Sequence, residues 1–307
     1  MNKTRVDLNI KLNDLVTFQS CSTLVSSIIK YLIYQRHQIP YTFEVLKHLV
    51  KRRKELVSND SEEEQSEISR HDRLTVEREF NKALDVYEAI DSVLRQIDSE
   101  LHSLSPEHNI QEIVIIFGTT ALHPKNVFRI VVPPVNYNHS DSSHPPQKLL
   151  NCLFRSMMTS DELNSILDHQ MCPTNTFILM KTDRKTIIKS DLFHLKDHFR
   201  IPPKAVGLKF VFTSDLRTED KKCCCVEDMS FFFCSPKQYD STTSSRLCHD
   251  FKLETVEPSE GDNDNDSENS NWFQFNFAIK GFKDCKLNGS SVTNLWMKYA
   301  RKQVDGS

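Results

Sequence analysis

Hydrophobic residues recur at helical spacing in the first part of the chain. After a cap at positions 22 or 23, Leu24, Ile28 and Leu32 mark the buried stripe of a helix that ends before Pro40. Proline suits the first turn of a helix, so a second helix is expected to start there, with Phe43 on its buried face. The pattern therefore predicts two successive helices with a bend between them.

Two more amphipathic helices are predicted further along. The longer one carries Phe80 and Leu94 on its apolar stripe and is closed by Pro106. The other begins near Leu149 and continues without a break through Ile166, as the last major helix of the chain. Both have one apolar side, so both are expected to pack on a sheet.

Strand-like runs dominate the later part of the sequence. Residues 112–117, EIVIIF, form an apolar run typical of a central strand buried on both faces, and residues 127–132 are its expected partner. Four later runs are also rich in apolar and aromatic residues and are predicted strands, at 176–182, 208–213, 229–234 and 272–282. Helices first and strands afterwards predict an α+β fold with helices on one side of a sheet, and not a doubly wound fold.

The last of these runs alternates aromatic and polar residues. Phe273, Phe275 and Phe277 occupy every second position, with Gln274 and Asn276 between them. Alternate residues of a strand point to the same face of a sheet. The three aromatic side chains are therefore expected to bury one face and to fasten the C-terminal segment to the sheet as a strand folded back onto it.

Polar stretches divide the chain into segments. We expect an N-terminal segment at 1–20, one domain at 21–284 and a C-terminal extension at 285–307. Within the domain, the polar stretches near 55–72 and 236–270 have too few apolar residues to offset the entropy lost on ordering, so they are predicted to be mobile insertions.

Charge and hydropathy exclude two classes of partner. Lys and Arg number 39 against 42 Asp and Glu, so a net charge of -3 gives no general field that would attract nucleic acid. No apolar run is long enough for a membrane span, and the N-terminus lacks the apolar core of a signal peptide. We therefore expect a protein of the nucleus and cytoplasm that binds neither nucleic acid nor membrane.

The only cluster suggestive of catalysis is rich in cysteine. Five of the nine cysteines lie between Cys223 and Cys248, and thiolates bind zinc tetrahedrally. Adjacent cysteines in a strand point to opposite faces, however, so the triplet at 223–225 cannot chelate as a CxxC pair does. With no HExxH, GxSxG or phosphate-loop motif, we expect no catalytic residue, metal or cofactor, and keep a thiol or zinc enzyme as the alternative.

Two side chains on the predicted helices have either a core or a binding role. Gln35 shares a broad helical face with Ile28 and Leu32, so its amide can bond a partner's backbone or cap the rim of the core. Phe154 has Leu150 and neighbouring apolar residues at helical spacing, and aromatic residues serve cores and interfaces alike. Periodicity alone leaves both readings open.

Three stretches in order resemble one known family. They are LIYQRHQIPYTFEVLKHLVKRR at 32–53, EIVIIFGTTALHPKNVFRI at 112–130 and WFQFNFAIKGFKD at 272–284, with LFRSMM at 153–158 between the last two. Together they resemble the comet family of Mad-two-binding proteins. The resemblance is poorest at 55–75, 133–147 and 214–270, and the chain runs on past the family's usual end near KGF.

The resemblance implies a fold and a function. The fold is HORMA-like, an α+β fold with three main helices packed on one face of a mostly antiparallel sheet and the C-terminal segment folded back as a strand. Members of the family act as non-enzymatic adaptors that bind the closed conformer of Mad-two. They deliver it to the AAA+ remodelling ATPase Pch-two, which dismantles the mitotic checkpoint complex and silences the spindle checkpoint. Location at the spindle or kinetochore in mitosis follows from the same resemblance.

The family's contact residues can be carried over to matching positions of this sequence, which gives candidate contact residues here. The family's Mad-two-contacting glutamine falls on Gln35, within YQR, and its contacting phenylalanine falls on Phe154, within LFR. The family's ATPase-contacting Pro-Lys pair falls on Leu195 and Lys196, so only the lysine is retained. A different HORMA protein that captures peptides under its C-terminal segment remains a further alternative.

Overall fold

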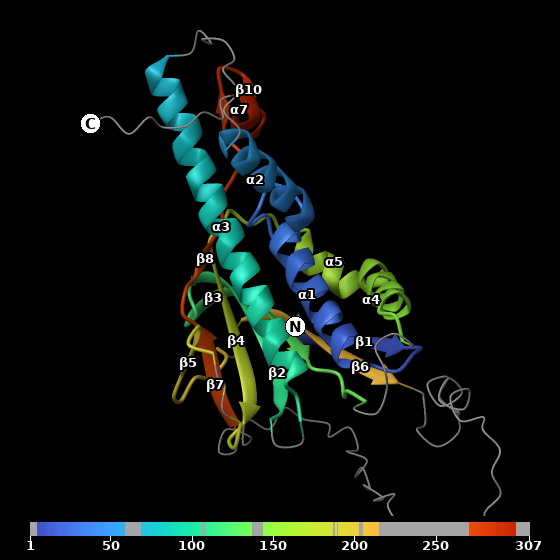
Figure 1. Cartoon of the computed structure of the whole chain (residues 1–307). Helices are drawn as coiled ribbons and strands as arrows, with labels where there is room; N and C mark the ends of the chain where they lie inside the picture. The colour runs from blue at the N-terminus through green and yellow to red at the C-terminus, as the bar shows by residue number, and fades with distance from the viewer. Residues whose placement is uncertain are drawn as a thin grey trace, which may run out of the picture.

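A computed structural model describes residues 5–58, 69–105, 108–136, 144–186, 188, 190–202, 205–214 and 270–298. Helices cover one side of a twisted sheet, and the longest of them runs along it and extends beyond it beside the second helix (Figure 1). The helices are α1 Phe18–Gln35, α2 Phe43–Ser58, α3 Arg70–His102, α4 Gln147–Thr159, α5 Asp161–Leu167 and α7 Val292–Lys298. The strands are β1 Arg5–Leu12, β2 Ile110–Thr120, β3 His123–Val131, β4 Asn175–Asp183, β5 Phe193–Leu195, β6 Val206–Ser214, β7 Ser270–Phe275, β8 Ile279–Lys280, β9 Lys286–Leu287 and β10 Ser290–Ser291.

The main sheet has eight strands and is mixed. Its order is β1-β6-β3-β2-β4-β7-β5, and β8 pairs with β4 beside β7. The pairs β1–β6 and β3–β6 are parallel, and the other pairs are antiparallel. The predicted α+β architecture is confirmed. Residues 5–12 form an edge strand of this sheet, so the segment expected at 1–20 supplies part of the fold and does not stand apart from it.

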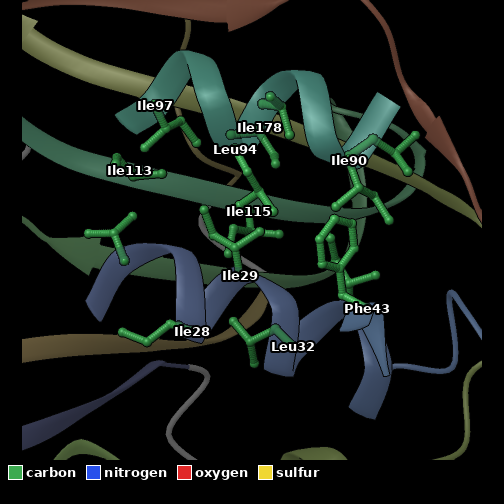
Figure 2. Packing of buried hydrophobic residues seen from close by; sticks show 14 of the residues in the cluster. Ile28, Ile29, Leu32, Phe43, Ile90, Leu94, Ile97, Ile113, Ile115 and Ile178 are labelled. Carbon is green, nitrogen blue, oxygen red and sulfur yellow. The ribbon is translucent and has the colours of Figure 1, made fainter. Parts of the chain in front are cut away.

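The helix-covered face of the sheet holds the main core. Ile113 and Ile115 of β2 point toward α1 and α3, whose side chains Ile29 and Leu94 are also buried (Figure 2). Because successive residues of a strand alternate between faces, Val114 points the opposite way. The predicted doubly buried strand at 112–117 is therefore central in the observed sheet, with β3 and β4 as its neighbours.

The opposite face has a smaller apolar cover. Val114 and Ile116 join a second cluster, to which the stretch between β5 and β6 contributes Phe199 and Ala205. The ring of Phe199 meets that of Trp272 edge-on, with centroids 5.3 Å apart. An irregular stretch thus shields this face where a helix shields the other.

Both ends of α1 differ from the sequence expectation. The helix begins at Phe18, because Thr17 and Ser20 form a reciprocal capping box that starts the helix earlier than the predicted cap at 22 or 23. It ends in a Schellman motif, in which His37 has φ +53° and the Gln38 N–H donates to the carbonyl of Ile33. This left-handed residue turns the chain out of the helix.

The neighbouring helix boundaries also differ. Pro40 lies in the connecting turn and α2 begins only at Phe43, so the predicted start at the proline is wrong. The helix expected from Leu149 through Ile166 is two helices, because Ser160 leaves the helical conformation and its Oγ accepts the Leu163 N–H as the N-cap of α5.

The C-terminal strand is shorter than its aromatic alternation predicts. β7 stops at Phe275, which is 2% exposed, while Phe277 is 61% exposed in the bend before β8. Asn276 accounts for the break, since its N–H donates to the carbonyl of Leu192 and its side-chain amide to that of Asp191. The expectation that all three phenylalanines bury one face is therefore wrong for Phe277.

Residues beyond 285 pack against the helical layer. Strands β9 and β10 form a hairpin, and α7 places Trp296, 2% exposed, against Phe80 with ring centroids 5.5 Å apart. Arg53 donates to the carbonyl of Trp296 and forms an ion pair with Glu77. These two contacts of Arg53 join α2, α3 and α7. The predicted C-terminal extension thus contributes to the core through residue 298.

The predicted mobile insertions fall mostly outside the described residues. Residues 55–58 belong to α2 and residues 70–72 to α3, so the first insertion is narrower than expected. Residues 59–68 and 236–269 lie outside the described part of the chain, as does the predicted strand at 229–234.

Candidate functional site: a surface formed by two helices

Gln35 and Phe154 lie on two helices that contact each other. Gln35 is the last residue of α1 and Phe154 lies in the middle of α4, and both side chains are half-buried. Tyr31, one turn before Gln35, meets Phe154 edge-on with ring centroids 6.5 Å apart. Fold and local helix geometry therefore bring the two predicted contact residues onto one surface. The half-exposure of Phe154 shows that it borders the core without being enclosed by it.

Two further side chains extend this surface. Tyr34, 36% exposed, precedes Gln35, and Met158, 58% exposed, lies one turn after Phe154 on α4. Tyrosine and methionine are enriched at protein interfaces. The sequence interpretation did not nominate Met158, although its spacing of four from Phe154 is the signal that would find it. We call Tyr31, Tyr34, Gln35, Phe154 and Met158 the α1–α4 surface.

A buried arginine lies directly behind Gln35. The side chain of Arg36 is enclosed, with 2% of the residue exposed, and its Nη1 donates to the carbonyls of Ile166 at 3.0 Å, Leu167 at 3.3 Å and His169 at 3.0 Å. The first two carbonyls belong to the last turn of α5, where the partners that the interior of a helix supplies are lacking, and the carbonyl of His169 lies just beyond it. Burial lowers the pKa of the Arg36 guanidinium below its ordinary value.

Gln38 joins the end of α1 to the C-terminal segment. Its Oε1 accepts the Thr174 N–H at 2.8 Å, and its backbone carbonyl accepts the Phe282 N–H at 2.9 Å. A Cβ at position 281 would come within 2.6 Å of the same Oε1 and 3.1 Å of the Gln38 carbonyl oxygen, so a larger residue there would displace the Gln38 amide. The stretches at 32–53 and 272–284, far apart in sequence, are thereby in contact.

Leu195 and Lys196 lie in a different part of the molecule. Leu195 ends β5 and is 48% exposed, and the Lys196 N–H donates to the carbonyl of Trp272 at 2.7 Å. β5 is at one edge of the sheet, whereas α4 packs near β1 at the other edge (Figure 1). The structure therefore separates this predicted pair from Gln35 and Phe154.

The described residues contain no group of three His, Cys, Asp or Glu that could hold a metal ion. The cysteines at 223–248, on which the thiol or zinc alternative depends, lie outside those residues. Of the described cysteines, Cys21 is fully buried, and burial raises its thiol pKa to about 12. Such a thiol is not activated as a nucleophile. Within the described part of the chain, no helix is long and apolar enough to cross a membrane.

Comparison with known proteins assigns the chain to a family. The model of the p31comet family, described as "Mad1 and Cdc20-bound-Mad2 binding", matches residues 8–239, which is more than half of the 307 residues. The chain belongs to the p31comet family. This family is HORMA-like, which confirms both the resemblance and the fold class expected from the sequence. The p31comet match includes Gln35, Phe154, Leu195 and Lys196, and it ends before β7.

Two curated relatives are similar over part of their length. The MAD2L1-binding protein of Homo sapiens is 23% identical over 189 residues, which are 62% of this chain and 64% of the human protein. The protein of the same name from Mus musculus is 25% identical over 189 residues, which are 62% of this chain and 63% of the mouse protein. The similarity thus covers less than two thirds of either p31comet relative.

Proposed function

We propose that this chain is a non-enzymatic adaptor that binds the closed conformer of Mad2, the Mad-two of the resemblance, through the α1–α4 surface. The observation that carries the proposal is the edge-on contact of Tyr31 with Phe154, which places the family-matched Phe154 beside the turn of α1 that leads to the family-matched Gln35. The family description, Mad1 and Cdc20-bound-Mad2 binding, supports the same class of partner. Exposed aromatic and methionine side chains on this surface suit a helix-mediated interface.

The proposal includes a second contact and a role in the cell. Leu195 and Lys196 would meet an AAA+ remodelling ATPase of the Pch-two type, to which the chain would present closed Mad2. Their position at the opposite sheet edge, away from the α1–α4 surface, supports two separate contacts. The consequence would be disassembly of the mitotic checkpoint complex and checkpoint silencing, in nucleus and cytoplasm and at the spindle or kinetochore during mitosis.

The binding surface is tested with Gln35→Ala combined with Phe154→Ala. Truncation of a central interface residue commonly costs about 2 kcal/mol, roughly thirtyfold in affinity, and two neighbouring truncations need not add. We expect the double variant to lose measurable affinity for closed Mad2 in calorimetry while retaining its thermal transition. Phe277→Ala is the matched control, because it removes an exposed phenylalanine outside the surface. Wild-type affinity in the double variant would contradict the proposed surface.

The second contact is tested separately with Lys196→Ala. The side chain is half-buried at the opposite edge of the sheet, so Mad2 affinity should be unchanged. The variant should stimulate the remodelling of Mad2 by the purified ATPase less than the wild type does. If stimulation persists in Lys196→Ala and also in Leu195→Ala, the ATPase does not use this edge.

A further inference from the structure

Arg36 connects the two halves of the α1–α4 surface from behind. It follows Gln35 directly, and its guanidinium reaches three carbonyls at the end of α5. Only Ser160 separates α5 from α4, and it caps α5 through the Leu163 N–H. A rigid connection therefore runs from Arg36 through α5 and Ser160 to the helix that carries Phe154.

The chemistry of this contact favours a buried cation. The C-terminal carbonyls of a helix carry partial negative charge and need donors when they are enclosed. Here Nη1 of the guanidinium is the donor, and a guanidinium is more weakly hydrated than an ammonium, so it is less costly to enclose. Because Arg36 is buried, it does not offer a contact to a partner. The hydrogen bonds of its guanidinium go to carbonyls of this chain, in the last turn of α5 and just beyond it.

We propose that Arg36 is a positioning residue for partner binding: it holds α5, and with it α4, against the end of α1, so that Gln35 and Phe154 are presented together. This inference rests on the proposed function of the α1–α4 surface. It assigns Arg36 an effect on affinity without contact to the partner, since preorganisation lowers the ordering cost of binding.

The chain supplies a matched control in Arg53. This residue is also enclosed, with 1% of it exposed, and it too donates to a helix carbonyl, that of Trp296. Its guanidinium lies 4.4 Å from the centre of the Phe80 ring, among α2, α3 and α7. Arg36→Met and Arg53→Met therefore remove the same buried charge and keep similar apolar volume. Only the first change touches the support of the α1–α4 surface.

The experiment measures the thermal unfolding of each variant and its affinity for purified closed Mad2. Affinity is measured at a temperature below the unfolding transitions of all variants. Both methionine variants should melt earlier than the wild type. Arg36→Met should bind about tenfold more weakly, within the range by which non-contacting residues modulate binding, and Arg53→Met should bind as the wild type does. Equal affinity of Arg36→Met and wild type would overturn the proposal, as would equal losses in the two variants.

A double-mutant cycle separates positioning from general loosening. In the wild type, Phe154→Ala should cause its full loss of affinity, whereas in Arg36→Met it should cause a smaller further loss, because Phe154 is then no longer held in place. Additive losses would overturn the proposal. If Arg36→Met does not fold, Arg36→Lys serves instead. It should fold and bind several-fold more weakly, and wild-type affinity in that variant would count against positioning.

The same measurements distinguish this proposal from the function on which it rests. If Gln35→Ala with Phe154→Ala leaves Mad2 binding intact, the surface itself is wrong. If that double variant fails to bind while Arg36→Met binds normally, the surface stands and the positioning role is wrong.

Discussion

The two faces of the sheet are shielded in different ways. On one face, α1 and α3 pack long rows of isoleucine and leucine over Ile113 and Ile115 (Figure 2). On the other face, Val114 and Ile116 are just as fully buried, yet part of their cover is the irregular stretch that carries Phe199 and Ala205. Burial of a strand residue therefore does not reveal what buries it.

The difference should appear in how each face responds to damage. Helices joined by many interlocked side chains move little when one side chain is shortened, so a cavity stays open. A stretch without regular structure has fewer partners and is better able to relax into the space. The following changes test this comparison, from the largest expected effect to the smallest.

The most direct test shortens two neighbours on β2. Ile115→Ala should cost about 4 to 5 kcal/mol of unfolding free energy, near the upper end for such changes, and Ile116→Ala about 2 to 3 kcal/mol. Both isoleucines are 0% exposed, so the pair is matched in residue type, strand and burial. Urea unfolding of the two variants measures the difference. Equal costs would show that both covers are equally rigid.

A second test acts on the irregular cover itself. Phe199→Ala should lower stability by about 2 kcal/mol, below the usual core value, because its ring contacts a half-buried Trp272. Amide exchange should accelerate in residues 196–202 and remain unchanged in α1 and α4. Faster exchange across the helical layer would mean that the two faces are coupled.

A third test concerns the end of α1 on the helix-covered face. A left-handed conformation costs a non-glycine residue about 1 kcal/mol, and His37 has φ +53°. His37→Gly should therefore stabilise the protein by up to about 1 kcal/mol, partly offset by the greater freedom of glycine in the unfolded chain. Thermal unfolding measures the gain. A loss of stability would show that the exposed imidazole itself makes a favourable contact.

The smallest expected effect concerns a charged contact at the margin of the same face. Burial alone would raise the pKa of Asp14, but the Leu15 N–H, His144 and Lys148 together lower it below its ordinary 3.8. A lowered folded-state pKa stabilises the protein above pH 3.8, and this contribution is lost as pH falls through the folded value. Asp14→Asn should flatten that part of the acid unfolding curve. An unchanged acid unfolding curve would show that Asp14 does not contribute to the loss of stability at low pH.

Much of the helical layer could be predicted from the sequence. Apolar residues at helical spacing indicated α1, α3 and the region of α4, and the run at 112–117 indicated a central strand. The ends of the elements were predicted less accurately, because Thr17, Ser160 and Asn276 act through a few hydrogen bonds that leave no periodic pattern in the sequence. The candidate contact residues came from a family resemblance, since periodicity alone left Gln35 and Phe154 undecided between core and interface.

The sequence by itself determined the repeating elements, because a local pattern of apolar residues decides which face of a helix or strand is buried. The tertiary structure alone decided which distant residues meet. Arg36 faces the end of α5, Gln38 faces Gly281, and α7 docks by Trp296 near Arg53. Each contact joins groups far apart in the chain, and it exists because a buried donor or acceptor must find a partner in space that no local pattern specifies.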